Sequence, residues 1–167
     1  MNDYPERKHN RLRQFDYNTI ASYFITICTA RRDKIFWSGT CDDSLSAAGL
    51  IVDEEIRNLP ERFDQVKIDK YVIMPDHVHL IISINGMTSK YHEKLPDIKN
   101  VVGCLKSKVT IRIGSGESVW QKSFYDHIIR DDNDYNGVWY YIETNPAKYL
   151  NPSGWTNTSV PGFMKLQ

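Results

Sequence analysis

The hydrophobic and polar residues of this chain repeat with two periods, one typical of strands and one typical of helices. Four segments rich in β-branched and aromatic residues are predicted strands: 23–30, 65–75, 77–84 and 119–130. Three longer segments are predicted helices, with apolar positions mainly three or four residues apart: 44–63, 97–113 and 131–150. The predicted order of elements is therefore β-α-β-β-α-β-α.

Local signals predict where the helices begin and end. We expect Pro60 to end the first helix and Asp132 or Asn133 to cap the last one. The last helix should lose its regularity near Pro146, because the residue before a proline disfavours helical backbone angles. The residues after Leu150 are expected to be irregular.

The order of elements predicts a known fold class. Pro75 and Asp76 form a short turn, so the strands on either side should pair as a hairpin. The first six elements then follow the split βαβ pattern of α+β, ferredoxin-like (RRM-like) folds. That pattern implies a four-stranded antiparallel sheet with helices on one face, to which this chain adds a C-terminal helix. A fold of this kind does not by itself give a function.

Length and composition set broad limits. The 167 residues, 41% of them hydrophobic, fit one domain spanning 1–167, with a basic arm at 1–20 and an irregular tail at 151–167. Twenty-one basic and twenty-one acidic residues balance, so net charge favours no particular partner. No apolar run could span a bilayer, and the polar N-terminus does not resemble a signal peptide. Three scattered cysteines favour a reducing, cytoplasmic setting.

Charge is distributed unevenly along the chain. Two segments carry several basic residues and no acid, which suggests local contact with an anion. The first contains Arg7, Lys8, Arg11 and Arg13, and the second contains Lys99, Lys106, Lys108 and Arg112. For any single lysine in these segments, a position on a solvated surface is about as common.

Two histidines stand in the apolar stretch "MPDHVHLII" at 74–82. His77 and His79 are two residues apart on a predicted strand, so they share one face with Cα atoms about 7 Å apart. A single histidine would more often form a hydrogen bond at a sheet surface. Two on one face favour a divalent metal ion, for which at least a third ligand is needed.

The last predicted helix offers that third ligand. Tyr141 and Asn145 are four residues apart and therefore lie on one helical face. Two imidazole nitrogens and the amide oxygen of Asn145 would suit Mg²⁺ or Mn²⁺ and leave positions open for phosphate oxygens. Tyr141 would lie one turn from the metal, placed to attack phosphorus. For Tyr141 taken alone, a core position is the commoner role.

These motifs together resemble a known family. "MPDHVHLII", followed about forty residues later by "SFYDHIIRDDNDYNGVWYYIETNPAKY", is similar to the single-tyrosine HUH transposases of the insertion-sequence type. The chain looks most like the REP-associated tyrosine transposases. The opening basic segment and "VVGCLKSKVT" are also similar to that family, so the resemblance covers nearly the whole chain.

The resemblance implies roles for individual residues. His77 and His79 match the metal-binding pair, and Asn145 matches a ligand that is glutamine in many relatives. Tyr141 matches the nucleophile. Tyr140 is its neighbour and rival, but one residue turns a helix by about 100°, and only Tyr141 shares a face with Asn145.

The resemblance also implies an activity. A metal-dependent endonuclease and strand transferase would cut single-stranded DNA beside a hairpin, forming a covalent 5′-phosphotyrosine and a free 3′-OH. The expected cofactor is Mg²⁺ or Mn²⁺. The expected partner is hairpin-bearing single-stranded DNA in the nucleoid, bound by a monomer or homodimer with no membrane involved. The candidate phosphate contacts are Arg130, the N-terminal basic residues Arg7, Lys8, Arg11 and Arg13, and Lys99, Lys106 and Lys108.

Three other interpretations share features with this sequence. Histidine-triad nucleotide hydrolases need a further histidine where Ile81 stands. A non-catalytic nucleic-acid-binding ferredoxin-like module would present aromatic residues, rather than histidines, on its open sheet face. A replication-initiator or relaxase-type nickase shares the HUH pair, and only the whole-chain resemblance separates it from a transposase.

Overall fold

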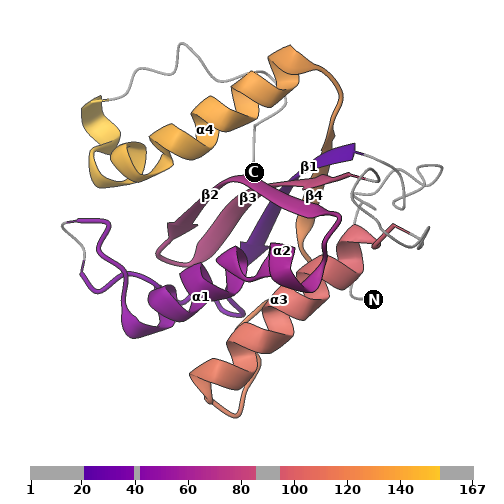
Figure 1. Cartoon of the computed structure of the whole chain (residues 1–167). Coiled ribbons are helices and arrows are strands. Elements are labelled where there is room, and N and C mark those ends of the chain that lie inside the picture. The colour runs from indigo at the N-terminus through magenta and orange to yellow at the C-terminus, as the bar shows by residue number, and fades with distance from the viewer. Residues whose placement is uncertain (1–20, 40–41, 86–94, 155–167) are drawn as a thin grey trace, which may run out of the picture.

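One antiparallel sheet forms the centre of the molecule (Figure 1). Its strands are β1 (Ala21–Cys28), β2 (Val66–Met74), β3 (His77–Ile84) and β4 (Tyr125–Ile129), in the order β2-β3-β1-β4. The two longest pairings join β1 and β2 to β3, and Pro75 and Asp76 make the predicted hairpin turn. The split βαβ prediction of an α+β, ferredoxin-like fold is confirmed.

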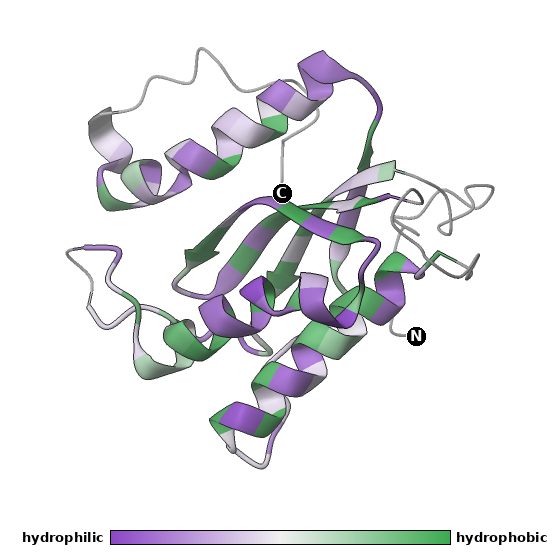
Figure 2. Cartoon of the chain, viewed as in Figure 1, coloured by the Kyte–Doolittle hydropathy of each residue, from purple (hydrophilic) through white to green (hydrophobic). Residues whose placement is uncertain are grey.

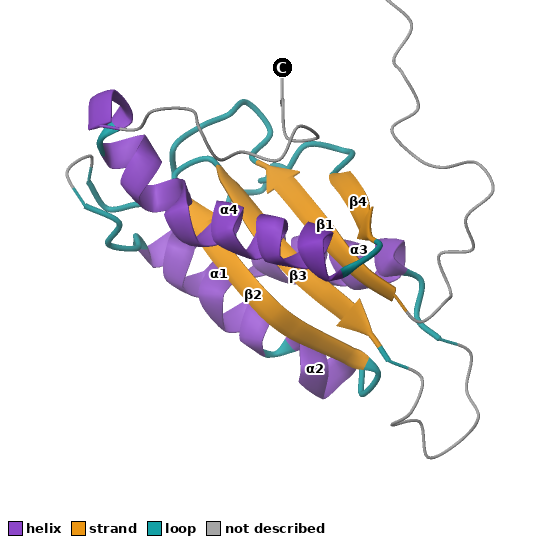
Figure 3. Ribbon diagram, turned by 90° about the horizontal axis from the view of Figure 1, so that it is seen from above, coloured by secondary structure: helices purple, strands orange, loops and turns teal. Residues whose placement is uncertain are grey.

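Helices lie on both faces of this sheet (Figures 1 and 3). They are α1 (Ala47–Arg57), the short α2 (Leu59–Arg62), α3 (Ile98–Ile113) and α4 (Asp132–Leu150), followed by the 3₁₀ turn η2 (Pro152–Gly154). Helices α1 and α3 cover one face, as predicted. The additional helix α4 crosses the opposite face, which an ordinary split βαβ fold leaves open.

The computed structural model describes residues 21–39, 42–85 and 95–154. The basic arm with Arg7, Lys8, Arg11 and Arg13 lies outside these ranges, as does most of the predicted tail. Within them, no helix combines the length and the apolar character needed to cross a membrane.

The alternation of side chains along the strands produces two separate cores. On β1, Tyr23 and Ile25 face α1 and α3 in the larger cluster, whereas Phe24 faces α4. Phe24 packs in a smaller cluster with Val138 and Ile142 of α4. Hydrophobic and hydrophilic residues are accordingly interleaved along strands and helices in Figure 2. The smaller cluster fixes α4 on the face that carries the histidines.

Two predicted helix boundaries were wrong. Pro60 does not end a helix, because α1 already ends at Arg57, and Pro60 instead lies in the first turn of α2. Proline fits there, since the first turn of a helix needs no N–H donor from it. The cap of α4 is Asp131, whose carboxylate accepts a hydrogen bond from the Asp134 N–H at 2.9 Å.

The expected break at Pro146 was also wrong. Helix α4 continues through Pro146 to Leu150. Beyond the proline, Tyr149 packs edge to face on Trp37, with ring centroids 5.4 Å apart. A proline removes one helical hydrogen bond, and tertiary contact on the following turn compensates for that loss.

The last strand is shorter than the predicted 119–130. Regular pairing begins only at Tyr125, and Trp120 makes an isolated bridge with Thr29. The Lys106 ammonium donates to the carbonyls of Gln121 and Lys122, at 2.6 and 3.0 Å. A side chain thus binds these two carbonyl groups, which lie before the regular pairing of β4 with β1 begins.

Candidate active site

The two histidines meet on the face of the sheet beneath α4. His77 begins β3, and His79 follows on the same side. Their Nε2 atoms lie 3.1 Å apart, with ring centroids 4.6 Å apart. Both nitrogens therefore point toward one place, as the sequence predicts for two residues of the same strand face.

The opposite nitrogen of each ring is held by a neighbouring side chain. His77 Nδ1 lies 2.6 Å from an Asp76 carboxylate oxygen, and His79 Nδ1 lies 2.8 Å from the Thr26 hydroxyl. Thr26 is directly opposite His79 in the pairing of β1 with β3. An ionised carboxylate only accepts, so His77 Nδ1 donates and its Nε2 keeps a lone pair. Carboxylate support of this kind orients metal-binding histidines in many proteins.

Burial favours the neutral form of both rings. Burial lowers the pKa of His77, and the Asp76 carboxylate opposes this only in part. His79 is 1% exposed, and burial together with the neighbouring His77 and Arg32 sets its pKa well below the usual value. Neutral imidazole is the form that binds metal ions.

Helix α4 directs one of its two adjacent tyrosines into this site. Val138 and Ile142 are buried against the sheet, and Tyr141 lies on the same side of the helix. The Tyr141 hydroxyl is 3.5 Å from His79 Nε2, with ring centroids 5.2 Å apart. Tyr140 is 44% exposed. The structure thus brings Tyr141, and not Tyr140, to the histidines.

Asn145 lies one turn beyond Tyr141. Its Nδ2 donates to the Tyr141 carbonyl at 3.2 Å, so one end of the amide is turned back onto the helix. Within the described ranges, no group of three or more His, Cys, Asp and Glu residues could hold a metal ion. A metal at the two Nε2 atoms would therefore need a ligand of another type, and the Asn145 amide oxygen is such a donor.

Three supporting residues were not foreseen from the sequence. Asp76 and Thr26 orient the histidines, and the Arg32 Nε lies 3.1 Å from the other Asp76 oxygen. Asp76 directly precedes His77, and Thr26 is a polar residue in an apolar strand, so each gave a weak signal. Arg32 has a backbone φ of +61°, which is uncommon for a residue other than glycine. No sequence pattern predicts this conformation.

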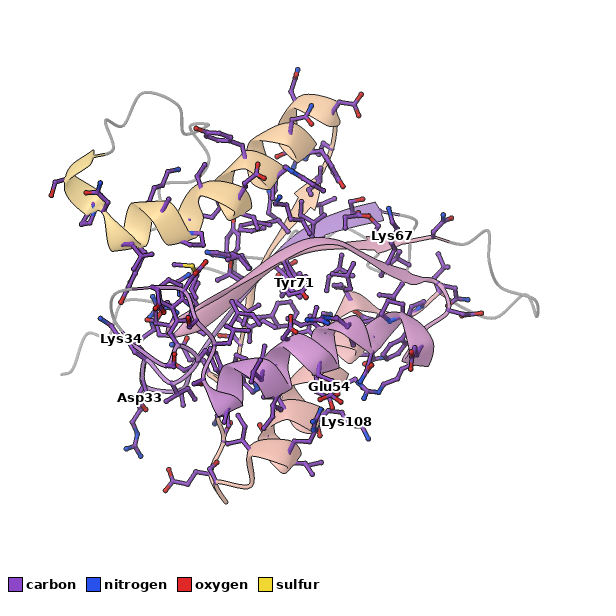
Figure 4. All side chains as sticks on the ribbon, turned by 60° about the vertical axis from the view of Figure 1, so that its left-hand side comes forward. Asp33, Lys34, Glu54, Lys67, Tyr71 and Lys108 are labelled. Atoms are coloured by element: carbon purple, nitrogen blue, oxygen red, sulfur yellow. The ribbon has the colours of Figure 1, made fainter. Side chains whose placement is uncertain are left out.

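The predicted phosphate contacts on α3 lie away from the histidines. Lys99, Lys106 and Lys108 belong to a helix on the opposite face of the sheet from α4, and Figure 4 shows Lys108 in that layer. Burial lowers the pKa of Lys106, and its ammonium already donates to two backbone carbonyls. Two of the three donors of the Lys106 ammonium are thus used within the protein. Lys99 lies 4.0 Å from Asp97, whereas Lys108 and Arg130 are exposed.

Several curated proteins are similar in sequence, although no family model matches the chain. An uncharacterized protein of Haemophilus influenzae is 33% identical over 158 residues, covering 84% of this chain and 88% of the relative. A second H. influenzae protein, provisionally named a REP-associated tyrosine transposase, is 26% identical over 140 residues, covering 80% and 74%. The REP-associated tyrosine transposase of Escherichia coli is 28% identical over 89 residues, covering 53% and 47%.

A solved structure shares the fold. The structure of a REP-associated tyrosine transposase bound to a REP hairpin matches with a TM-score of 0.61 and 20% identity. The match covers 83% of this chain and 74% of the other. This chain therefore shares the arrangement of its sheet and helices with a solved structure.

Proposed function

This chain belongs to the family of REP-associated tyrosine transposases, and on that premise we propose that it cuts and rejoins single-stranded DNA beside hairpins. One observation carries the proposal. The Tyr141 hydroxyl lies 3.5 Å from His79 Nε2, which itself lies 3.1 Å from His77 Nε2. A hydroxyl nucleophile beside two convergent neutral imidazoles suits metal-assisted phosphoryl transfer.

The metal would be bound by His77, His79 and the amide oxygen of Asn145. Their donor atoms, two neutral nitrogens and one amide oxygen, suit a divalent ion such as Mg²⁺ or Mn²⁺. When bound, such an ion polarises the scissile phosphate and stabilises the departing 3′-oxygen. Asp76 and Thr26 keep both Nε2 atoms directed toward that position.

Tyr141 would perform the covalent step. Its hydroxyl oxygen bonds to phosphorus, the bond from phosphorus to the 3′-oxygen breaks, and a 5′-phosphotyrosine and a free 3′-OH result. The covalent bond keeps the energy of the phosphodiester, so a 3′-OH can reverse the step and join strands. A metal at this site would use the lone pair of His79 Nε2, so His79 would not accept the Tyr141 proton. The proton lost from the Tyr141 hydroxyl passes to solvent, and the departing 3′-oxygen takes one up to become the 3′-OH.

We propose that the partner is single-stranded DNA next to a hairpin. The structural neighbour described above is bound to a REP hairpin. A regular duplex holds its phosphates on a convex rod, whereas a single strand can bend to bring a phosphate to the Tyr141 hydroxyl. Binding should weaken with salt, because basic residues contact phosphates.

The test offers one labelled sequence in three forms: with its hairpin, without it, and as a full duplex. We expect a covalent protein–DNA adduct, resolved on a denaturing gel, with the hairpin form and little or none with the duplex. Equal cleavage of all three forms would contradict the proposed substrate. No adduct with any form would contradict the chemistry and favour a non-catalytic binding module.

A further inference from the structure

Exposed aromatic and lysine side chains gather where the C-terminal half of α4 approaches the segment that follows β1. We define the α4 patch as Lys148 and Tyr149 of α4 together with Lys34, beside the ring of Tyr141. Tyr149 is 38% exposed. Figures 1 and 3 show this end of α4 lying over the segment after β1, and Figure 4 shows Lys34 toward it. Large exposed rings beside charged groups are a common property of binding surfaces.

The patch is continuous with the candidate nucleophile. The Lys148 ammonium lies 5.9 Å from the ring centroid of Tyr141. At the other end, the Lys34 ammonium lies 5.5 Å from the ring centroid of Tyr149. A molecule that leaves Tyr141 along this side of the helix therefore meets a cation or an aromatic ring at each step.

Buried structure supports the far end of the patch. Tyr149 packs against Trp37, which is 6% exposed and donates from its indole nitrogen to the Ile73 carbonyl at 2.7 Å. The Tyr149 ring is therefore held from beneath while more than a third of the residue stays exposed. An anchored ring of this kind loses little conformational freedom when a second ring stacks on it.

Charge favours an anionic occupant. The patch contains two lysines and no acid. The nearby Glu143 carboxylate lies 3.3 Å from the Lys70 ammonium. Asp33 precedes Lys34 in the chain and Asp43 lines a cavity with Pro146 of α4, so acids border the patch but none belongs to it. Alternating aromatic rings and cations are the groups with which proteins bind single-stranded nucleic acid.

We propose that the α4 patch binds the single-stranded flank of the DNA that Tyr141 cleaves, an inference that rests on the proposed function. Tyr149 stacks on a base, and Lys34 and Lys148 contact phosphates. Eight helical residues separate Tyr149 from Tyr141, which is about 12 Å along the axis. The patch therefore holds a few nucleotides on one side of the scissile phosphate, and binding to it does not depend on the hairpin.

The experiment measures binding and cleavage separately. Hairpin oligonucleotides carry flanks from zero to eight or so nucleotides on either side of the cleavage site. Fluorescence anisotropy in the full-length Tyr141→Phe protein gives affinity without cleavage, and adduct formation in the protein with Tyr141 gives activity. The patch variants are Lys148→Gln, Tyr149→Ala and their combination. Tyr149→Phe keeps the ring, and Lys67→Gln removes one lysine on β2, outside the patch.

We expect affinity to rise at least tenfold as the flank on one side lengthens, and the double variant to lose most of that gain. Tyr149→Phe and Lys67→Gln should keep it, and all proteins should bind the flankless hairpin alike. Thermal melting by circular dichroism confirms that the variants are folded.

Two results would overturn the inference. In the first, the affinity of the double variant still rises fully with flank length. In the second, loss of the patch changes only the self-association of the protein, measured by analytical ultracentrifugation. Neither depends on cleavage. Absence of any adduct with the protein that retains Tyr141 would instead count against the proposed function.

Discussion

His79 and Tyr141 are 62 residues apart in the chain, yet their side chains are within 3.5 Å of each other. Each has a distinct support. His79 is held by Thr26 from the neighbouring strand, and Tyr141 meets the Phe24 ring edge to face at 5.9 Å. The site therefore depends on β1 as much as on the two elements that carry its reactive groups.

The first residue-scale prediction concerns the nucleophile. Tyr141→Phe should abolish covalent attachment to DNA, because only the attacking hydroxyl is lost. Binding and thermal stability should change little, since the ring still packs on Phe24. Tyr140→Phe is the matched control and should keep adduct formation, because the Tyr140 hydroxyl is on a different side of the helix. The opposite pattern would assign the reaction to Tyr140.

The second concerns the metal. His77→Ala, His79→Ala and Asn145→Ala should each reduce adduct formation at least a hundredfold, because each removes a proposed ligand. A chelator should do the same to the unmodified protein, and added Mg²⁺ or Mn²⁺ should restore it. Isothermal titration with Mn²⁺ gives an independent measure of the lost site. Undiminished cleavage in excess chelator would exclude a metal role.

At the scale of elements, close packing between α1 and the preceding segment requires a glycine. A Cβ built on Gly49 would lie 2.2 Å from the Phe36 carbonyl oxygen, which is backbone and not free to move aside. The same segment binds the start of the helix, because the Ser46 hydroxyl donates to the Ile35 carbonyl at 2.6 Å. Helix α1 is thereby fixed against the loop that leads from β1.

The third prediction therefore compares two helical glycines. Gly49→Ala should lower the free energy of unfolding by about 2 kcal/mol or more, because the clash outweighs the helical preference of alanine. Gly103 is an exposed position of α3 with nothing within 4 Å of a new Cβ. Gly103→Ala should raise the free energy of unfolding by about 0.5–1 kcal/mol. Urea unfolding measures both, and a neutral Gly49→Ala would contradict the close approach.

On the scale of the whole molecule, a buried carboxylate joins three helices. Glu55 of α1 is 3% exposed and pairs with Arg62 of α2 at 2.7 Å and Arg112 of α3 at 2.9 Å. Burial alone would raise the pKa of Glu55, but the hydrogen bonds and charges of the two guanidinium groups outweigh it, and the pKa is lowered. The ionised form is thus the one that the folded molecule stabilises.

The fourth prediction follows from the lowered pKa of Glu55. A carboxyl group with a lowered pKa in the folded state stabilises the fold above its unfolded pKa of about 4.3. That contribution is lost as the pH falls through the folded pKa. Glu55→Gln should therefore lower the free energy of unfolding by about 2 kcal/mol at pH 7, and the difference from the original protein should shrink below pH 4. A difference that stays constant with pH would show that Glu55 is not stabilised as an anion.

Much of the fold is determined by patterns within short stretches of the sequence. The two-residue turn at Pro75 and Asp76 joins two apolar strands, so the β2–β3 hairpin follows from neighbours in the chain. Strand alternation likewise places His77 and His79 on one face, and helical periodicity places Tyr141 with Asn145. These relations depend only on backbone geometry over a few residues.

Tertiary structure alone decided what depends on contacts between distant residues. Tyr149 packs on Trp37 beyond Pro146, where α4 continues, and Lys106 binds the carbonyls of Gln121 and Lys122. The sequence shows Lys106 only as a basic residue and does not reveal the carbonyls beside it. A sequence pattern records which side chains share a face, whereas the packing of one element on another determines what that face meets.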